Sequence, residues 1–569
     1  MNQNVLEKVN AWKNEETLNA ELRRELENLN EDELYDAFYK DLEFGTGGLR
    51  GVLGVGTNRM NIYIVGKATK GFIDYTLETY PDAKERGIVI SYDCRHKSQE
   101  FAKIASSIIA ATGTKVYMFS NLRPTPELSY AVRHLECVGG IMITASHNPP
   151  QYNGYKVYDH TGCQLVPHQA DQVIARIRKI TDLFNVPTMD FEEGVKQGLI
   201  HVIDEEIDRH FVDACRTVKV QDLPAEVKKN IKIVVTPLHG TAQVSLPTLL
   251  KEEGYDVHVV EEQMVADPNF STCKSPNPEN KEAFELAEKL GREIHADLLI
   301  ATDPDADRMG IGVLNSDGSY TYLTGNQSGC LLLDYLATFK KISKKGVVLN
   351  TIVTSNSGKA VCDMHGLRLI QTLTGFKFIG EQMGILEHSE TEEFFFGYEE
   401  SYGYVIRDFV RDKDSIQSSL LLCEVASYYK SQNMTLVDAL AALYEKIGYF
   451  QEDLINIYME GESGAKKIEQ IVRHFQNNHL TEVAGKKVQS VEDYDKLVKY
   501  ENGEETPLLL PKSLVIKYIF DDGGWFVLRP SGTEPKLKIY ISVKGETKQA
   551  AINFVEQLKK AVADITENI

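Results

Sequence analysis

The sequence has few of the features that mark secreted, membrane-spanning or zinc-binding proteins. Its 569 residues include only eight cysteines, and these are far apart, with no C-x-x-C pair for zinc or dithiol chemistry. No apolar run approaches the roughly 20 residues that cross a bilayer. Residues 1–28 are polar and lack the apolar segment of a secretory signal. We therefore predict a cytoplasmic protein with reduced thiols and no membrane partner.

Positive charge is also scarce. The chain has 62 Lys and Arg against 83 Asp and Glu, which leaves a net charge of -21. Such a charge repels phosphate backbones and anionic lipids at long range, so nucleic acid is excluded as a partner. If the ligand is an anionic small molecule, its Arg and Lys partners must be concentrated locally. Net charge does not determine assembly, and we expect a monomer or a dimer.

The composition is that of a globular protein with several domains. Hydrophobic residues make up 42% and charged residues 25%, which is close to the usual globular mixture. At about 150 residues per domain, this length corresponds to three or four domains. Helical spacing of apolar residues predicts helices over 5–39, before a glycine-rich turn at 45–51.

Apolar runs that alternate with helical patterns follow this turn. They predict three successive α/β units, and after about Tyr449 the pattern changes to a smaller α+β domain. That last domain is expected to have a polar loop at 501–507, short strands through 538–542 and a C-terminal amphipathic helix. The main predicted strands of the α/β units are 87–91, 115–119, 140–144, 231–235, 256–260, 296–301, 346–350 and 393–397.

Three aspartates directly follow one of these apolar runs. Asp303, Asp305 and Asp307 alternate in the segment TDPDADR at 302–308. Carboxylates at the C-terminal end of a strand can converge on one hard cation, and oxygen ligands suit Mg²⁺. An EF-hand is excluded because Arg308 and Leu314 stand where Gly and Glu are required. A phosphatase with an aspartyl nucleophile in a D-x-D-x-[TV] pattern is the second hypothesis, although Asp307 replaces its Thr or Val.

A serine follows another predicted strand, in the segment TASHNPPQYNGYK at 144–156. Ser146 lies in no G-x-S-x-G elbow, so an activated hydrolase serine is not indicated. A phosphorylated Ser146 would carry about -1.5 to -2 charge and would need a metal and cationic donors. Alone, this serine is more typical of a turn or a helix cap than of a phosphate carrier. Combined with the aspartates and Arg308, it indicates a phosphate carrier.

Three further segments are candidate ligand-binding loops. RPSGTEPK at 529–536 combines a guanidinium, hydroxyls and close backbone N–H groups, which together suit a phosphate dianion. In GYEESYG at 397–403, Glu399 and Ser401 can hydrogen-bond sugar hydroxyls, although an acidic turn explains the pattern almost as well. GTGGLRG at 45–51 lacks the Lys-Ser/Thr ending of an ATP-binding loop and the G-x-G-x-x-G spacing of a dinucleotide-binding loop. We expect Arg50 in this loop to point into a shared cleft.

Four of these motifs, in this order, resemble those of the α-D-phosphohexomutase superfamily, most closely its phosphoglucomutase and phosphomannomutase members. They are TASHNP at 144–149, DPDADR at 303–308, GYEES at 397–401 and RPSGTEP at 529–535. The resemblance spans nearly the whole chain. It implies an α/β fold with four domains around a central cleft, three related α/β domains with mixed sheets and a C-terminal α+β domain. The expected domains are 1–205 with the phosphoserine loop, 206–325 with the metal loop, 326–449 with the sugar loop and 450–569 with the phosphate loop.

The resemblance also implies roles for individual residues. Ser146 is the expected phosphoserine, and its phosphate binds Mg²⁺ together with the three aspartates. Cleft residues that handle charge and protons would be Arg50, His147, Lys156, Arg308 and Lys413, with the general base left open between His147 and Lys413. Sugar and phosphate binding would fall to Glu399, Ser401, Arg529, Ser531, Gly532 and Thr533.

The predicted activity is that of an isomerase, an intramolecular phosphotransferase that interconverts α-D-glucose 1-phosphate and glucose 6-phosphate. Glucose 1,6-bisphosphate would be intermediate and activator. Two departures from the family pattern leave mannose and pentose phosphates as alternative substrates: Pro304 replaces a usual Gly, and Tyr398 replaces a small residue. Both resemble the longer-chain subgroup that includes phosphopentomutases. A metal-dependent sugar-phosphate phosphatase and a catalytically silent sugar-phosphate sensor are the remaining hypotheses.

Overall fold

The computed structural model describes residues 3–45, 47–459, 461–531 and 536–569. These form two compact units. Unit 1 comprises the described parts of Met1–Gly325, Phe339–Lys344 and Phe376–Thr435. Unit 2 comprises the described parts of Asn326–Thr338, Lys345–Gly375 and Leu436–Ile569.

Unit 1 begins with the helices expected from the apolar spacing, α1 (Gln3–Asn14), α2 (Ala20–Asn28) and α3 (Glu31–Phe38). Asn19 and Asn30 cap α2 and α3 by accepting hydrogen bonds from backbone N–H groups, which satisfies donors that a helix start otherwise leaves free. The buried Trp12 packs edge-on against Phe38, with ring centroids 5.6 Å apart. These helices therefore have a small core of their own.

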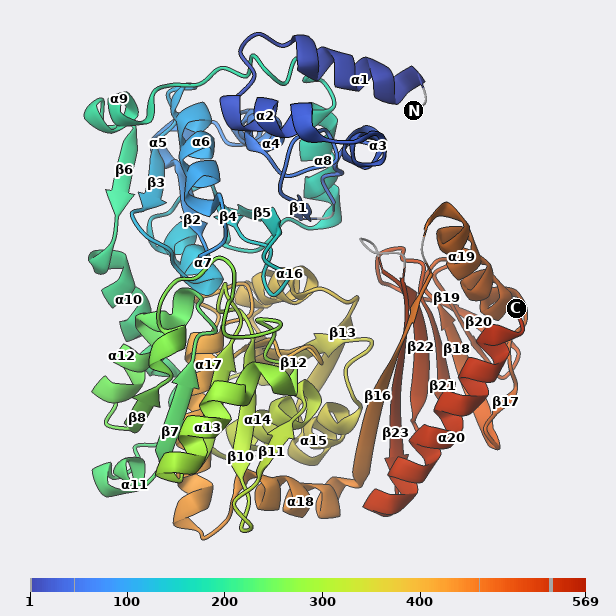
Figure 1. The fold of residues 1–569 in the computed structure, drawn as a ribbon. Helices are drawn as coiled ribbons and strands as arrows, with labels where there is room; N and C mark the ends of the chain where they lie inside the picture. Colours follow the sequence, from blue (N-terminus) through green and yellow to red (C-terminus); the bar gives the residue numbers. More distant parts are fainter. Residues whose placement is uncertain (1–2, 46, 460, 532–535) are drawn as a thin grey trace. The chain divides into compact units, whose positions relative to one another are not determined.

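A six-stranded mixed sheet follows, in the order β1-β5-β4-β2-β3-β6 (Figure 1). Strands β4, β2, β3 and β6 are parallel, while β5 and β1 extend the sheet as antiparallel strands. The antiparallel turn between β4 and β5 brings residues 144–151 to one edge. The strands are β1 (Gly48–Val52), β2 (Ile88–Tyr92), β3 (Val116–Phe119), β4 (Gly139–Ile143), β5 (Tyr152–Asp159) and β6 (Ile200–Ile203).

Helices cover both faces of this sheet, because its strands carry apolar side chains on both sides. One face packs on α4 (Ile62–Thr79), α6 (Ser98–Ala110) and α8 (Pro167–Ile177). The other packs on α7 (Thr125–His134) and α10 (Glu205–Cys215). The short helices of this region are α5 (Ala83–Arg86) and α9 (Phe191–Lys196).

The second sheet of unit 1 has the order β11-β10-β9-β7-β8 (Figure 1). Strands β9, β7 and β8 are parallel, and β10 and β11 are antiparallel. Here, too, an antiparallel pair, β9 and β10, encloses a loop with polar residues. The elements are β7 (Lys232–Thr236), β8 (Asp256–Val259), β9 (Leu298–Thr302), β10 (Met309–Leu314), β11 (Tyr320–Leu323), α11 (Ala225–Lys229), α12 (Ser245–Glu252) and α13 (Glu285–Ile294).

The remaining α/β segments are shared between the two units. Unit 1 contains α16 (Phe376–Glu387), the antiparallel pair β14 (Glu392–Tyr398) and β15 (Tyr404–Val405), and α17 (Ser415–Ser431). Unit 2 contains most of α14 (Gly325–Phe339) and all of α18 (Leu436–Ile447). It also contains α15 (Ser357–His365) and the parallel pair β12 (Lys345–Thr351) and β13 (Arg368–Thr372).

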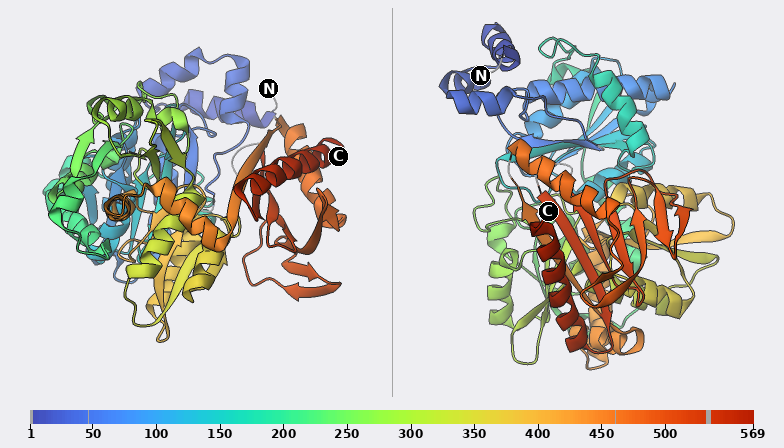
Figure 2. Two further views of the ribbon diagram at one scale, coloured as in Figure 1. Left: turned by 90° about the horizontal axis from the view of Figure 1, so that it is seen from below. Right: turned by 90° about the vertical axis from the view of Figure 1, so that its right-hand side faces the viewer.

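An antiparallel sheet with helices on one face forms the C-terminal part of unit 2. Its order is β16-β23-β22-β21-β18-β19-β20, with β17 beside β18. Both views of Figure 2 show α20 lying along it, and α19 and α20 share one apolar core with its strands. The elements are β16 (Tyr449–Tyr458), α19 (Gly461–Asn477), β17 (Glu482–Val483), β18 (Lys486–Asp493), β19 (Val498–Glu501), β20 (Glu504–Pro507), β21 (Ile516–Phe520), β22 (Trp525–Pro530), β23 (Lys536–Gly545) and α20 (Lys548–Glu567).

The predicted loop at 501–507 is wrong. Residues Glu504–Pro507 form strand β20, which pairs with β19 in a hairpin. Asn502 and Gly503 form the turn, with φ angles of 53° and 83°, and Asn-Gly is favoured where both central turn residues need positive φ. The sequence does not reveal β20, because its composition is polar and all four of its residues are exposed at the sheet edge.

All eight cysteines are free thiols, as predicted, and all except the half-buried Cys273 are buried. Within the described ranges, no helix combines the length and the apolar character needed to cross a membrane.

Candidate active site

The three aspartates form a buried cluster in the loop between β9 and β10 of unit 1. Asp303, Asp305 and Asp307 are at most 1% exposed, and one carboxylate oxygen of each lies within 4.8 Å of the others. Asp305 Oδ1 and Asp307 Oδ1 are buried and have no hydrogen-bond partner among the residues that the structure describes. Buried polar atoms are normally satisfied, so these oxygens and the all-carboxylate donor set fit a hard divalent cation. The cluster can hold a metal ion.

Three cationic side chains surround the cluster. Lys156, on β5, places Nζ 2.7 Å from Asp305 Oδ2 and 3.3 Å from Asp307 Oδ2. Lys413 Nζ lies 2.8 Å from Asp307 Oδ2. Arg308, which directly follows the cluster, pairs with Glu279. The structure therefore brings the predicted Lys156, Arg308 and Lys413 together with the aspartates.

Burial and neighbouring charges shift the pKa values of the carboxyl groups in different directions. Burial, Asp307 and Asp305 together raise the pKa of Asp303 well above its usual value. Although burial acts in the opposite direction, Lys156 lowers the pKa of Asp305. Burial likewise opposes ionisation of Lys413, but the nearby carboxylates, first Asp307, raise its pKa. Two ionised carboxylates and two lysine cations therefore neutralise one another.

Local backbone geometry and a neighbouring helix hold the aspartate loop. Ala306 has φ 56°, an uncommon left-handed conformation for a non-glycine residue. Its carbonyl accepts hydrogen bonds from Ser415 N and Oγ at 3.2 and 2.6 Å. On another side, Thr125 donates from N and Oγ1 to Asp305 O and Oδ2, both at 2.9 Å. Sequence patterns singled out neither Thr125 nor Ser415.

Ser146 lies beside the cluster, in the turn between β4 and β5. Its Oγ donates to Asp303 Oδ2 at 2.7 Å, and the residue is 3% exposed. Ser146 also has φ 51°, and its backbone N–H donates to Thr144 Oγ1 at 2.8 Å. Such positive φ values at functional loops require support from the surroundings. The predicted serine and the predicted metal ligands are thus in direct contact.

Arg95, which motif analysis missed, supplies that support. Its Nη2 donates to the carbonyls of Ser146 and Asn148 at 2.5 Å, and its Nη1 donates to those of Pro149 and Tyr152 at 2.9 and 3.1 Å. Its Nε lies 3.2 Å from Asp93 Oδ2, with both side chains fully buried. Asp93 and Arg95 closely follow the predicted strand at 87–91. This position was the sequence signal that could have identified Arg95 as a site residue. A charged pair that directly follows a buried strand in an α/β unit marks the ligand-binding edge of the sheet.

Replacing Arg95 is expected to loosen the serine turn. Arg95→Met should lower the free energy of unfolding by about 3 to 5 kcal/mol, because Asp93 would remain buried without its charge partner. It should also lower kcat. Arg95→Lys should restore part of both. Denaturant unfolding and steady-state kinetics measure the effects.

Arg292→Met is the matched control for this experiment, since that side chain is 50% exposed and pairs with Glu288 within one helix. Equal stability of Arg95→Met and the control would contradict the positioning role of Arg95.

His147 and Arg50 contact the serine turn. His147 Nδ1 is 3.2 Å from Ser146 Oγ. Burial, followed by the cations Arg308 and Arg50, lowers the pKa of His147 well below its usual value, so its ring is neutral near pH 7. Arg50, on β1, is exposed and donates from Nη1 to Asn148 Oδ1 at 3.0 Å. Both residues therefore border the serine turn.

The predicted sugar loop also reaches the metal loop within unit 1. Arg308 and Gly403 form a β-bridge, and Met309 N donates to Tyr402 O at 3.0 Å. Glu399 is 4% exposed, and burial raises its pKa to about 7. Ser401 Oγ donates to the Glu400 carboxylate at 3.3 Å. Glu399 is thus near the charged cluster, while Ser401 faces its sequence neighbour.

The predicted phosphate loop belongs to unit 2. Arg529 is at the end of β22, where Nη1 donates to Tyr540 Oη at 3.4 Å. Ser531 N donates to Lys536 O at 2.8 Å, which closes the loop between β22 and β23. Gly532 and Thr533 lie outside the described residues.

Comparisons with known proteins cover most of the chain. Family models described as Phosphoglucomutase/phosphomannomutase, alpha/beta/alpha domains I, II and III, match residues 41–183, 209–316 and 324–447. The model of the C-terminal domain matches residues 479–561. Helices α1 to α3 therefore precede the matched segments.

Curated relatives and solved structures agree with these matches. Phosphoglucomutase of Staphylococcus epidermidis is 38% identical over 522 residues, covering 91% of this chain and 93% of the relative. That of Staphylococcus aureus is 38% identical over 517 residues, covering 90% and 91%. The open form of parafusin, a phosphoglucomutase of Paramecium, has a TM-score of 0.67 at 18% identity, covering 93% of this chain and 96% of its own. A phosphoglucomutase/phosphomannomutase family protein of Burkholderia thailandensis has a TM-score of 0.65 at 16% identity, covering 92% and 97%. These two structures are similar in fold.

Proposed function

Because this chain belongs to the phosphoglucomutase/phosphomannomutase family, we propose that it interconverts α-D-glucose 1-phosphate and glucose 6-phosphate. The reaction runs through a phosphoserine at Ser146 and glucose 1,6-bisphosphate. The observation that carries this proposal is the 2.7 Å hydrogen bond between Ser146 Oγ and Asp303. A phosphate on this oxygen would lie directly against a metal-binding carboxylate cluster.

In the first half-reaction, the free hydroxyl oxygen of the sugar phosphate attacks the phosphorus on Ser146. The bond between phosphorus and Ser146 Oγ breaks, and the proton of the sugar hydroxyl ends on Ser146 Oγ, which becomes a free hydroxyl. In the second, Ser146 Oγ attacks the other phosphate of the reoriented bisphosphate. The neutral His147 ring, 3.2 Å from Oγ, accepts the serine proton in this step, and the proton ends on the sugar oxygen that leaves the phosphorus.

Charge stabilisation and positioning contribute most of the rate acceleration. Phosphoryl transfer has a loose, highly charged transition state, which fixed cations stabilise without reorganisation. Lys156 and Arg308 are held beside the transferred group by their own carboxylate partners. Lys413 is paired with Asp307 and its pKa is raised, so it acts as a cation rather than as a base.

The metal ion is Mg²⁺ in this proposal, held by Asp303, Asp305 and Asp307 together with the serine phosphate. When bound, it neutralises charge that develops on the phosphate oxygens. The carboxylate donor set supports Mg²⁺ over softer metals, and the two unpartnered oxygens, Asp305 Oδ1 and Asp307 Oδ1, provide places for it.

Recognition of the sugar is assigned to Glu399 and Ser401, and the non-transferring phosphate to Arg529, Ser531, Gly532 and Thr533. Arg529→Ala is expected to raise KM for glucose 1-phosphate about 10- to 100-fold, because hydrogen bonds to charged groups contribute about 1.5 to 3 kcal/mol. Mg²⁺ affinity should stay unchanged, since the aspartates belong to another loop. Steady-state kinetics and Mg²⁺ titration measure the two effects.

Arg473→Ala removes a helix-surface arginine of the same unit, which pairs with Asp495, and serves as the control. A KM for Arg529→Ala equal to that of this control would refute the role of Arg529.

A coupled assay with glucose 1-phosphate, mannose 1-phosphate and ribose 1-phosphate, each with a trace of the matching bisphosphate, tests the function. We expect the highest kcat/KM with glucose 1-phosphate. A higher value with mannose or ribose phosphate would assign the chain to the corresponding mutase. Release of free phosphate at the rate of substrate consumption would indicate a phosphatase instead. No turnover of any sugar, with retained binding, would indicate a sensor.

The proposal includes a cytoplasmic location, a monomer or dimer, and domains at 1–205, 206–325, 326–449 and 450–569 around one cleft. The order of the four matched family segments supports this division. The boundaries of the two compact units differ from these domain boundaries, because Asn326–Thr338 belongs to unit 2 and Phe376–Thr435 to unit 1.

A further inference from the structure

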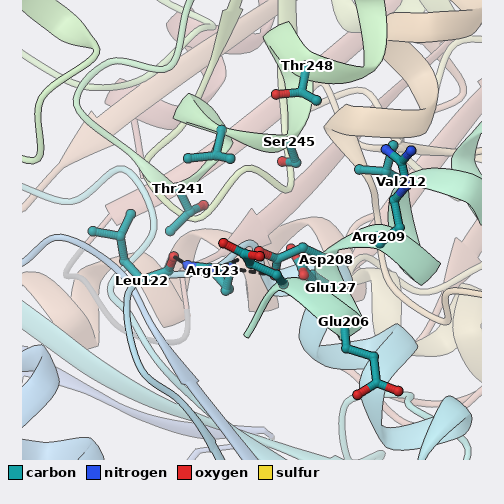
Figure 3. Close-up of a pocket in the computed structure, with 12 residues that line it drawn as sticks. Leu122, Arg123, Glu127, Glu206, Asp208, Arg209, Val212, Thr241, Ser245 and Thr248 are labelled. Carbon is teal, nitrogen blue, oxygen red and sulfur yellow. Dashed lines mark hydrogen bonds and ion pairs between the residues drawn. The ribbon is translucent and has the colours of Figure 1, made fainter. Parts of the chain in front are cut away.

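Unit 1 contains a cavity whose lining includes none of the predicted site residues. It has a volume of about 580 Å³ and is lined by the segment before α7, by α7, α10 and the start of α12 (Figure 3). Cavities of roughly 300 to 1,000 Å³ are typical of sites for small organic ligands.

Two buried hydroxyl groups in this cavity have no partner. Thr241 and Ser245 are 2% and 7% exposed, and within the described part of the chain neither Thr241 Oγ1 nor Ser245 Oγ makes a hydrogen bond. Figure 3 shows them on the side opposite Arg123, Glu127 and Asp208. An unsatisfied buried polar group costs about 1 to 3 kcal/mol. A ligand that hydrogen-bonds to these hydroxyls would recover this cost.

The charges around the cavity favour a cation. Arg123 is already occupied, since Nε and Nη2 lie 2.7 and 2.8 Å from the two oxygens of Asp208. Burial raises the pKa of Glu127 well above its usual value, which favours the neutral form of this group. Arg209 pairs with Glu252 at 3.2 Å. At the rim, the exposed Glu205 and Glu206 form no ion pair among the described residues, so uncompensated negative charge remains there.

Apolar side chains complete the wall. Leu122, Val212 and Val244 line the cavity, and Val244 is 56% exposed, unusually open for a large aliphatic residue. We propose that this cavity binds a small organic ammonium compound. Its charged head lies near Glu205 and Glu206, its hydrogen-bonding groups meet Thr241 and Ser245, and its apolar body covers Leu122 and Val244.

Two walls of the cavity also hold the aspartate loop. Thr241 N donates to Pro304 O at 2.8 Å. The preceding Gly240 packs so closely that a Cβ there would lie 2.4 Å from Pro304 Cα. On the other wall, Thr125 binds Asp305 through N and Oγ1, two residues before Glu127. If the proposed metal site holds Mg²⁺, a bound ammonium compound that shifts these walls would change Mg²⁺ affinity, and by thermodynamic reciprocity Mg²⁺ would change its affinity equally.

Three probes that share one ring test the proposal. Cyclohexylmethylamine, cyclohexylmethanol and cyclohexanecarboxylate differ only in their polar group. With the full chain, ligand-observed NMR titrations should give saturable binding of the amine, about tenfold or more tighter than the alcohol, and no binding of the carboxylate. Binding of the carboxylate as tightly as the amine, or no binding of the amine, would overturn the proposal.

Variants locate the site independently of mutase activity. The double change Glu205→Gln and Glu206→Gln should weaken amine binding about tenfold, whereas Glu192→Gln with Glu193→Gln, in the first turn of α9, should not. Thr248→Trp, at an exposed lining position, should fill the cavity and abolish binding while the circular dichroism spectrum is retained. Unchanged amine affinity in Thr248→Trp, or Mg²⁺ affinity unaffected by saturating amine, would refute the corresponding claim.

Discussion

Ser146→Ala is expected to lower mutase turnover at least about 1,000-fold, because the variant has no oxygen that can store the phosphoryl group between the two half-reactions. Binding of glucose 1-phosphate should persist, since Lys156 and Arg308 keep their own carboxylate partners. Folding should persist as well, because the Ser146 hydrogen bonds to Thr144 and Arg95 use its backbone atoms. A coupled assay measures turnover, and calorimetry measures binding.

Ser431→Ala is the matched control, because Ser431 is exposed and its Oγ donates to the nearby Tyr428 carbonyl and accepts from Gln432 Nε2. It should retain normal turnover. Mass spectrometry of the purified protein should find one phosphate on the Ser146 peptide and none in Ser146→Ala. Near-normal turnover of Ser146→Ala would end the phosphoserine mechanism, whatever the substrate.

Asp305→Asn is expected to weaken Mg²⁺ binding at least about 100-fold, and to reduce turnover at fixed Mg²⁺ correspondingly. The change removes the negative charge of the Asp305 carboxylate, whose Oδ1 has no partner within the described ranges. Of the two aspartate partners of Lys156, it leaves Asp307, at 3.3 Å. A buried cation that loses a partner also destabilises the fold. Isothermal titration with Mg²⁺ measures the affinity, and high Mg²⁺ should restore part of the turnover.

Asp317→Asn is the matched control for the metal site. Asp317 is exposed in the β10–β11 turn, where its carboxylate accepts hydrogen bonds from the backbone and hydroxyl of Ser319. The control should bind Mg²⁺ like the parent protein. Equal Mg²⁺ affinity in Asp305→Asn and in the control would place the ion elsewhere and remove the basis for the proposed metal site.

The local sequence pattern was sufficient to predict most helices and strands and the kinds of residue in the site. The strand β9 and the aspartates that follow it are contiguous in sequence, so apolar spacing and ligand chemistry together predict a carboxylate cluster at a strand end. The edge strand β20 was missed because all of its residues are exposed, and an edge strand with no buried face lacks the apolar alternation that identifies strands. Its Asn502-Gly503 turn was the better signal.

The sequence by itself determined the order of the motifs, the strands that carry them and the kinds of side chain available for phosphate and metal. Only the tertiary structure decided that Ser146 meets Asp303, 157 positions away, that Arg95 holds the serine turn, and that Thr125 and Ser415 hold the aspartate loop. The physical reason is that these contacts join loops at the ends of different strands. Their distances depend on sheet order and helix packing, which the spacing of residues along the chain does not encode.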